Sequence, residues 1–129
     1  MIEKIEKLKE VVKNLEIEHG PLLICALFLR DDAMGKWDIV IAASWLNSSE
    51  MRSYEILSQE LKKFLSDSDL VYFSRIVILD RDDPIISYLL DLETIKNGGY
   101  KELSSDALSD KFKFLIKKAY LLRSQKLSK

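Results

Sequence analysis

Carboxylates at the ends of apolar runs are the residues of this sequence whose type and spacing could do chemistry. Residues 75–83 read Arg-Ile-Val-Ile-Leu-Asp-Arg-Asp-Asp, so an apolar run delivers Asp80 and Asp82 to its end, and Asp38 lies in a second apolar run at residues 37–45. If these runs are strands that present their acids at one edge of a sheet, several oxygens meet there, as a hard cation such as Mg²⁺ requires. Asp38, Asp80 and Asp82 are therefore the candidate catalytic residues of a metal-dependent phosphoryl-transfer or hydrolase-type enzyme.

The segment Asp80-Arg81-Asp82 resembles the Asp-x-Asp motif of phosphoryl-transfer enzymes of the haloacid dehalogenase type. The resemblance implies a nucleophile and a Mg²⁺ ligand. It stops after the second aspartate, because Pro84 and Ile85 replace the Thr and Leu of that motif. A comparison with nucleotidyltransferases, which hold two metals with paired acids on one strand, fails at Val40, where the second acid would stand.

A structural interpretation of the same acids competes with the catalytic one. Asp83 followed by proline is a good helix start, so the acidic loop can serve as a helix cap. Arg30, Arg75 and Arg81 are available to neutralise Asp38 and its neighbours in a salt-bridge cluster. Both interpretations stay open at the level of sequence.

Other kinds of catalytic site lack the residues that they need. The chain has one histidine, His19, and one cysteine, Cys25, and it contains neither a G-x-S-x-G nor a GK[ST] motif. One cysteine cannot form an internal disulfide, and Cys25 in an apolar run is expected to be a buried thiol. No cofactor is predicted, and Mg²⁺ belongs to the catalytic alternative alone.

Composition and charge limit the class of protein. The chain has 129 residues, of which 47% are hydrophobic and 32% charged, and its net charge is −1. We expect one α+β domain in the cytoplasm, without a membrane segment and without general affinity for nucleic acid. Residues 111–129 hold seven basic and no acidic side chains, whereas residues 30–110 hold nine basic and sixteen acidic ones.

Two apolar runs, residues 22–30 and 37–45, predict a central β-hairpin around a turn that contains Gly35. We expect Arg30 to lie opposite Trp37, so that Phe28 faces Ile39. Further elements are a helix at 2–18, a helix at 48–66 begun by Asn47 and Glu50, an interior strand at 70–79, a helix at 85–95, a short strand at 100–103 and a last helix from 105 or 109 to about 124. The sheet is therefore mixed or antiparallel, an architecture similar to that of profilin-like and roadblock-like modules, although no residue motif supports either family.

The predicted C-terminal helix offers an interaction surface. On a helical wheel Phe114 and Leu121 fall beside Lys113, Lys117 and Lys118, away from the apolar face. Three explanations stay open: a surface for self-association or a protein partner, a helix covered on both sides by the N-terminal helix, and stacking on RNA. We favour the first, and predict a homodimeric, non-enzymatic interaction or regulatory module.

Overall fold

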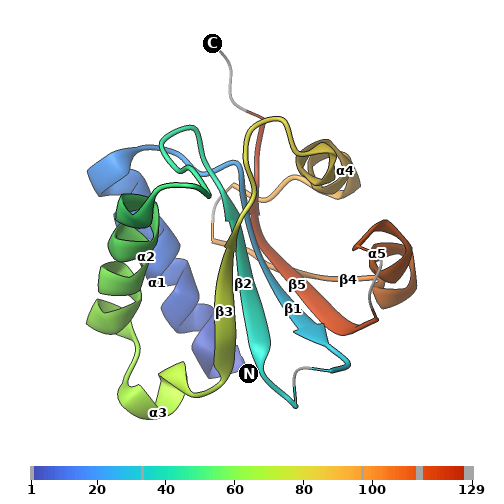
Figure 1. Ribbon diagram of the computed structural model, residues 1–129, viewed down its shortest axis with the longest axis horizontal. Helices are drawn as coiled ribbons and strands as arrows, with labels where there is room; N and C mark the ends of the chain where they lie inside the picture. The colour runs from blue at the N-terminus through green and yellow to red at the C-terminus, as the bar shows by residue number, and fades with distance from the viewer. Residues whose placement is uncertain (1, 33, 97, 113–114, 127–129) are drawn as a thin grey trace.

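A five-stranded mixed sheet with helices on both faces forms the core of the computed structural model (Figure 1), which describes residues 2–32, 34–96, 98–112 and 115–126. The predicted α+β class is confirmed. The strands are β1 (Ile24–Arg30), β2 (Trp37–Ala42), β3 (Phe73–Ile78), β4 (Lys101–Leu103) and β5 (Ile116–Ser124), and they lie in the order β3-β2-β1-β5-β4. The helices are α1 (Ile2–His19), α2 (Met51–Phe64), α3 (Asp67–Leu70), α4 (Pro84–Leu92) and α5 (Ser105–Phe112).

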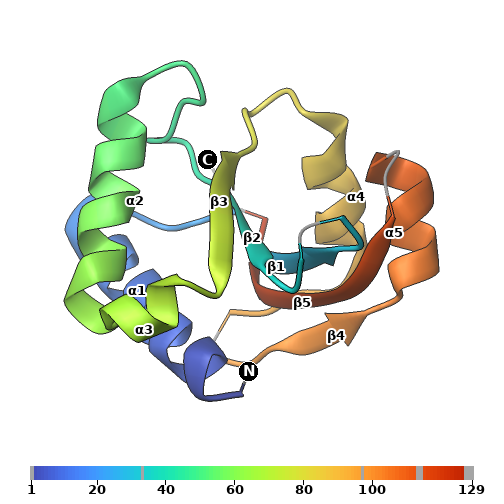
Figure 2. The same cartoon turned by 60° about the horizontal axis from the view of Figure 1, so that its bottom comes forward.

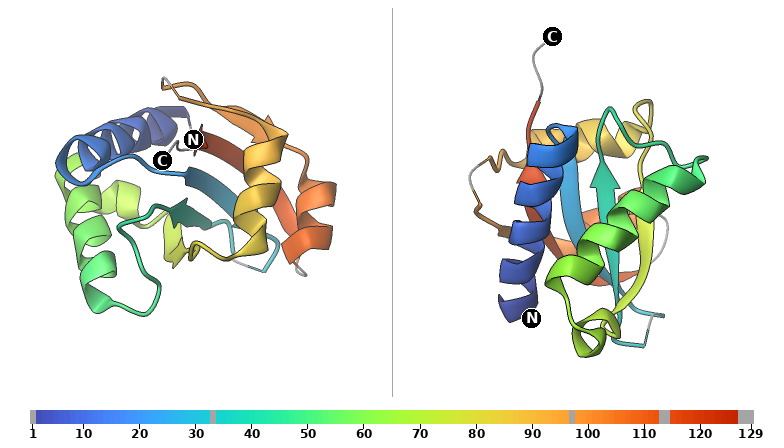
Figure 3. Two further views of the ribbon diagram at one scale, coloured as in Figure 1. Left: turned by 90° about the horizontal axis from the view of Figure 1, so that it is seen from above. Right: turned by 90° about the vertical axis from the view of Figure 1, so that its left-hand side faces the viewer.

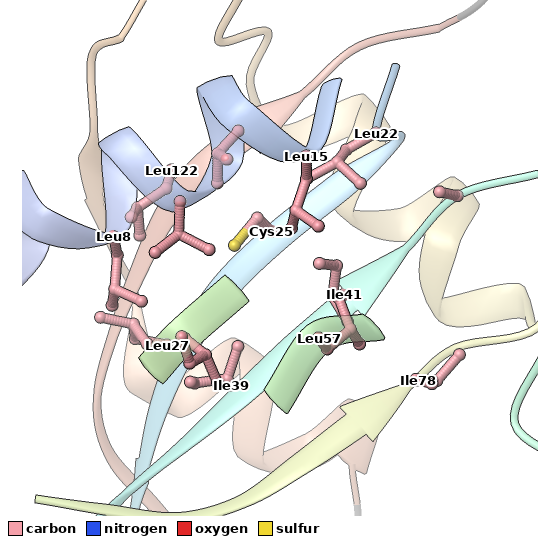
Figure 4. Close-up of a cluster of buried hydrophobic side chains, with 14 of the residues drawn as sticks. Leu8, Leu15, Leu22, Cys25, Leu27, Ile39, Ile41, Leu57, Ile78 and Leu122 are labelled. Atoms are coloured by element: carbon pink, nitrogen blue, oxygen red, sulfur yellow. The ribbon is translucent and has the colours of Figure 1, made fainter. Parts of the chain in front are cut away.

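Helices α1 and α2 cover one face of the sheet, and α4 and α5 cover the other (Figure 3). Alternation along β1 decides which residues each layer receives. Cys25 and Leu27 pack toward α1 and α2 (Figure 4), whereas Ile24, Ala26 and Phe28 pack toward α4 and α5. The central strands are therefore covered on both sides.

The N-terminal helix forms as predicted and packs on the sheet of its own chain. Its apolar stripe is buried in the layer between sheet and helices. The helix ends at His19 and is followed by Gly20, whose φ of +124° favours glycine. His19 has a structural position, because its ring stacks on Trp45 with 4.9 Å between centroids. Trp45 in turn donates from Nε1 to the carbonyl oxygen of Gly20 at 3.1 Å.

The central hairpin is confirmed, but its register differs from the prediction by one residue. Trp37 lies opposite Leu29 rather than Arg30, and Ile39 lies opposite Leu27 rather than Phe28. The observed register places Arg30 on the same face as Asp38, where its Nε donates to Asp38 Oδ2 at 2.7 Å. The predicted register would have turned Arg30 away from that buried carboxylate.

Strand β3 occupies the edge of the sheet and not the interior position that was predicted for residues 70–79. It pairs with β2 in parallel, and no strand of the described residues lies on its outer side. Ser74 and Arg75 are exposed. An interior strand buried on both faces would seldom accommodate these two polar residues, so they are the signal that the sequence interpretation underweighted.

The prediction of a C-terminal helix that continues to residue 124 is wrong. Helix α5 ends at Phe112, and the basic segment after it contains β5, which pairs antiparallel with both β1 and β4. Alternating burial explains the result: Ala119 and Leu121 pack toward α4 and α5, whereas Leu122 packs toward α1. Strand β1 needs a second neighbour, and β5 provides it.

The short helix α3 was not predicted, and the other remaining elements agree with the prediction except at their ends. Asp83 caps α4 as predicted, because its Oδ1 accepts from the backbone N of Ile85 at 3.0 Å. Helix α2 begins only at Met51, and Asn47 accepts from the backbone N of Ser49 instead of capping the helix. The expected short strand is confirmed as β4.

A polar network ties the end of α1 to the end of β5. Arg123 is almost fully buried, and its Nη2 lies 3.0 Å from Glu16 Oε1. Glu16 Oε2 also accepts from the backbone N of Leu22 at 2.8 Å and from Gln125 Nε2 at 2.9 Å. A buried guanidinium needs such partners, so the network fixes the position of α1 on the sheet.

We expect Leu121→Ala to lower the free energy of unfolding by about 2–5 kcal/mol, because truncation leaves a cavity around a fully buried side chain of β5. Urea unfolding measures the loss. Leu115→Ala is the matched control: its side chain is 67% exposed, so a change within about 0.5 kcal/mol is expected. Equal effects of both variants would contradict the placement of Leu121 in the core.

Candidate functional site

An open cleft lies where the parallel strands β2 and β3 end. The polypeptide after β2 (residues 44–47), Glu50 and residues 80–82 line it. Carboxyl ends of parallel strands are a common place for ligands in α/β sheets. Two of the predicted catalytic residues, Asp80 and Asp82, line this cleft.

The carboxylate of Asp80 is held by Ser48. Its Oδ1 accepts from the backbone N of Ser48 at 2.9 Å, and its Oδ2 accepts from the Ser48 hydroxyl. These two donors hold the pKa of Asp80 below its ordinary value. Asp80 therefore joins the loop after β2 to the end of β3, which is a positioning role. Asp82 is exposed and has no hydrogen bond or ion pair within the described chain.

Asp38 lies at the other end of the sheet, fully buried under two arginines. Its Oδ2 lies 2.7 Å from Arg30 Nε and 3.2 Å from Arg75 Nε. Its Oδ1 has no hydrogen-bond partner in the described chain. The predicted salt-bridge cluster is confirmed for Asp38 with Arg30 and Arg75.

The predicted acidic residues do not converge. Asp38 aligns with Arg75 on the parallel strand β3, and Asp80 follows Arg75 by five residues. At ~3.3 Å per residue the backbone positions of Asp38 and Asp80 are roughly 16 Å apart along the strands. Within the ranges that the structure describes, no three His, Cys, Asp or Glu side chains are grouped as they would be around a metal ion.

The predicted interaction surface is divided by the strand that replaces the helix. Lys113 and Phe114 lie outside the described residues. Lys117 and Lys118 are exposed on β5, whereas Leu121 is fully buried. Lys118 and Leu121 extend from opposite faces of the sheet, and the described members of the set therefore form no common surface.

The sequence interpretation missed the open edge of β3 and the groove beside it. The groove runs between β3 and α2, and its apolar lining is provided chiefly by Tyr54, Leu70, Phe73 and Ile76. Upstream of the strand, Val71 and Tyr72 are 60% and 48% exposed. A free strand edge beside an apolar groove is a recurring place for binding an extended polypeptide.

No family model matches the chain, and neither the curated proteins nor the solved structures give a significant match. No helix in the described part of the chain combines the length and the apolar character that crossing a bilayer requires.

We expect Asp38→Asn to destabilise the fold by roughly 3 kcal/mol, because it removes the charge that Arg30 and Arg75 share inside the protein. The half-exposed position of Arg75 keeps the loss at the lower end of the range for buried pairs. Asp82→Asn is the control and should change the free energy of unfolding by no more than about 0.5 kcal/mol. A neutral Asp38→Asn variant in urea unfolding would show that this cluster does not stabilise the sheet.

The contact of Asp80 with Ser48 predicts a pH dependence. Because the pKa of Asp80 is lowered in the folded protein, its contribution to stability is present above the unfolded pKa near 3.8 and is lost as the pH falls through the folded pKa. Ser48→Ala should raise the pKa of Asp80 in a carboxyl NMR titration and lower stability at neutral pH, with the difference disappearing in acid. Ser49→Ala, whose exposed hydroxyl makes no contact with Asp80, should leave that titration unchanged.

Proposed function

We propose that this chain is a non-enzymatic interaction module that binds a polypeptide strand along the open edge of β3. The observation that supports the proposal is a six-residue edge strand on whose outer side no other strand lies in the part of the chain that the structure describes. Unpaired backbone N–H and C=O groups on such an edge are a template for a further strand.

The opposite edge of the sheet supports this choice by contrast. Figure 2 shows β3 and β4 on opposite sides of the three central strands. Strand β4 has three residues, and both Lys101 and Glu102 are exposed along it. Short length and charge are the usual protection of a sheet edge. Strand β3 is longer, and the only charged residue in it, Arg75, makes an ion pair with Asp38.

The groove beside β3 determines what kind of strand would bind. Ile76 extends toward the α2 side of the sheet, and Tyr54 and Leu70 continue the apolar lining. In an added strand, alternate side chains share a face with Ile76 and lie over this groove. The proposed ligand is therefore an extended segment with apolar residues at alternate positions.

Selection from a displayed library of random short peptides tests the proposal. We expect enrichment of alternating apolar sequences on the parent protein. The Ser74→Lys variant should bind the selected peptides at least about tenfold more weakly by calorimetry, or ~1.4 kcal/mol, because the lysine enters the lining of the groove. Ser74 is exposed, so this variant leaves the core intact.

Ile17→Lys provides the matched control, since it adds the same charge at a 73% exposed apolar side chain of α1. It should bind the peptides as the parent does. Failure to obtain any peptide that discriminates between the parent and Ser74→Lys would refute strand binding at this edge.

A further inference from the structure

We propose that the strand bound at the β3 edge is β3 of a second copy of this chain, in an antiparallel register that places Ile76 opposite Ile76 on a twofold axis. This inference rests on the proposed function, because it names the occupant of the same edge. It would join two five-stranded sheets into one continuous sheet, a closed arrangement of the kind that twofold symmetry produces.

Symmetry and charge select the register. In an antiparallel pair, two residues directly opposite each other either both direct their backbone N–H and C=O groups toward the other strand or both direct them away from it. Two identical strands related by a twofold axis meet this condition only if one residue lies opposite the same residue of the second copy. The registers with the greatest overlap of residues 73–78 centre on Arg75 or on Ile76, and the second keeps Ser74, where the pairing with β2 is irregular, at the end of the paired segment. The first would place two guanidinium groups opposite each other, which is destabilising. The second places two isoleucines together and Arg75 opposite Val77.

Apolar area favours the same choice. With Ile76 on the axis, the two Ile76 side chains meet on the α2 face, where each continues the lining of its own groove. The two grooves then adjoin across the axis, and Phe73 and Tyr54 of each copy border the shared apolar surface. Burial of such a surface is the main favourable contribution to association between proteins.

The charges of α2 are complementary under the same twofold operation. One side of α2 contacts α1, through Glu60 with Asn14 at 2.7 Å and Lys63 with Glu18 at 3.7 Å. Glu55 and Lys62 are two turns apart on another, exposed side. A twofold axis perpendicular to the sheet at Ile76 reverses α2 in the second copy, so the half of α2 that contains Glu55 in one copy lies on the same side as the half that contains Lys62 in the other. Glu55 also has Arg52 at 3.5 Å, an exposed pair that leaves it accessible.

Disulfide trapping tests the register. Directly opposite residues in an antiparallel pair have Cα atoms about 4.5–5.5 Å apart, within the ~4.4–6.8 Å range of a disulfide. Ile76→Cys should therefore form a covalent dimer under mild oxidation. Ser74→Cys is the control: it is more exposed, but in this register it faces Ile78 of the second copy, and two cysteines at position 74 are several residues apart.

The natural thiol does not interfere with this experiment. Cys25 is buried under α1, and burial raises its pKa to about 12, so it remains protonated and unreactive. We expect Ile76→Cys to form the dimer at least about tenfold faster than Ser74→Cys. Without oxidant, sedimentation velocity should show the parent as a dimer at micromolar concentration, and Ser74→Lys as a monomer.

The outcomes separate this inference from the proposed function. If the parent sediments as a monomer and Ile76→Cys forms a disulfide no faster than Ser74→Cys, the second copy is not the occupant. The peptide selection then decides independently whether the edge binds a strand of another protein. If the parent is a dimer but Ser74→Cys is trapped faster, the register centred on Ile76 is wrong.

Discussion

Burial of the central hairpin on both faces is the constraint on which the rest of the structure depends. Every residue of β2 is buried, as are Ile24–Phe28 of β1. A strand whose side chains are apolar on both faces cannot have either face exposed to solvent, so helices must cover both sides of the sheet. Helix α1 precedes the hairpin and α2 follows it. Both cover one face of the sheet, and α4 and α5 cover the other face.

The same constraint brings the C-terminal segment into the sheet, because β1 needs a hydrogen-bonding neighbour on its second side. Insertion of β5 buries Arg123 and Ser124, and the positions of Glu16 and of the loop that contains Lys96 follow from the need to satisfy that guanidinium.

Patterns that depend on neighbouring residues could be predicted from the sequence, and those that depend on distant ones could not. The apolar stripe of α1, the Asp83 cap of α4 and the two strands of the hairpin are local, and all three were found. Residues 116–124 have apolar side chains at spacings that suit a helix as well as a strand. The choice between helix and strand depends on β1, which needs a hydrogen-bonded neighbour and lies about ninety residues earlier in the chain.

The predicted register of the hairpin was wrong for a related reason. It depends on the long connection, in which Met34 and Gly35 both have positive φ, and on the buried pair of Arg30 with Asp38.

The candidate acidic site shows the same limit. Asp80 and Asp82 do follow a strand, and the cleft around them exists. Whether Asp38 could join them depended on the direction of β3 relative to β2. Because these strands are parallel, the beginning of β2 and the end of β3 lie at opposite ends of the sheet. The chain uses each carboxylate locally instead: Asp38 neutralises two arginines, and Asp80 accepts from Ser48. Opposite charges and hydrogen-bond donors of the same chain thus take up the negative charges that a metal ion would otherwise have to balance.

The crossover from β2 through α2 to β3 also determines which edge is left open. It places β3 outside β2, and no later segment of the described chain returns to cover it. A charged residue in the middle of an edge strand normally discourages pairing with another molecule, because its charge would be desolvated. Arg75 has that position, but its guanidinium extends toward Asp38 of the neighbouring strand and its charge is already compensated there. Compensation from inside the sheet lowers the electrostatic cost of adding a strand at this edge. The salt bridge that stabilises the beginning of β2 therefore also weakens the protection that the charge of Arg75 gives to the edge of β3.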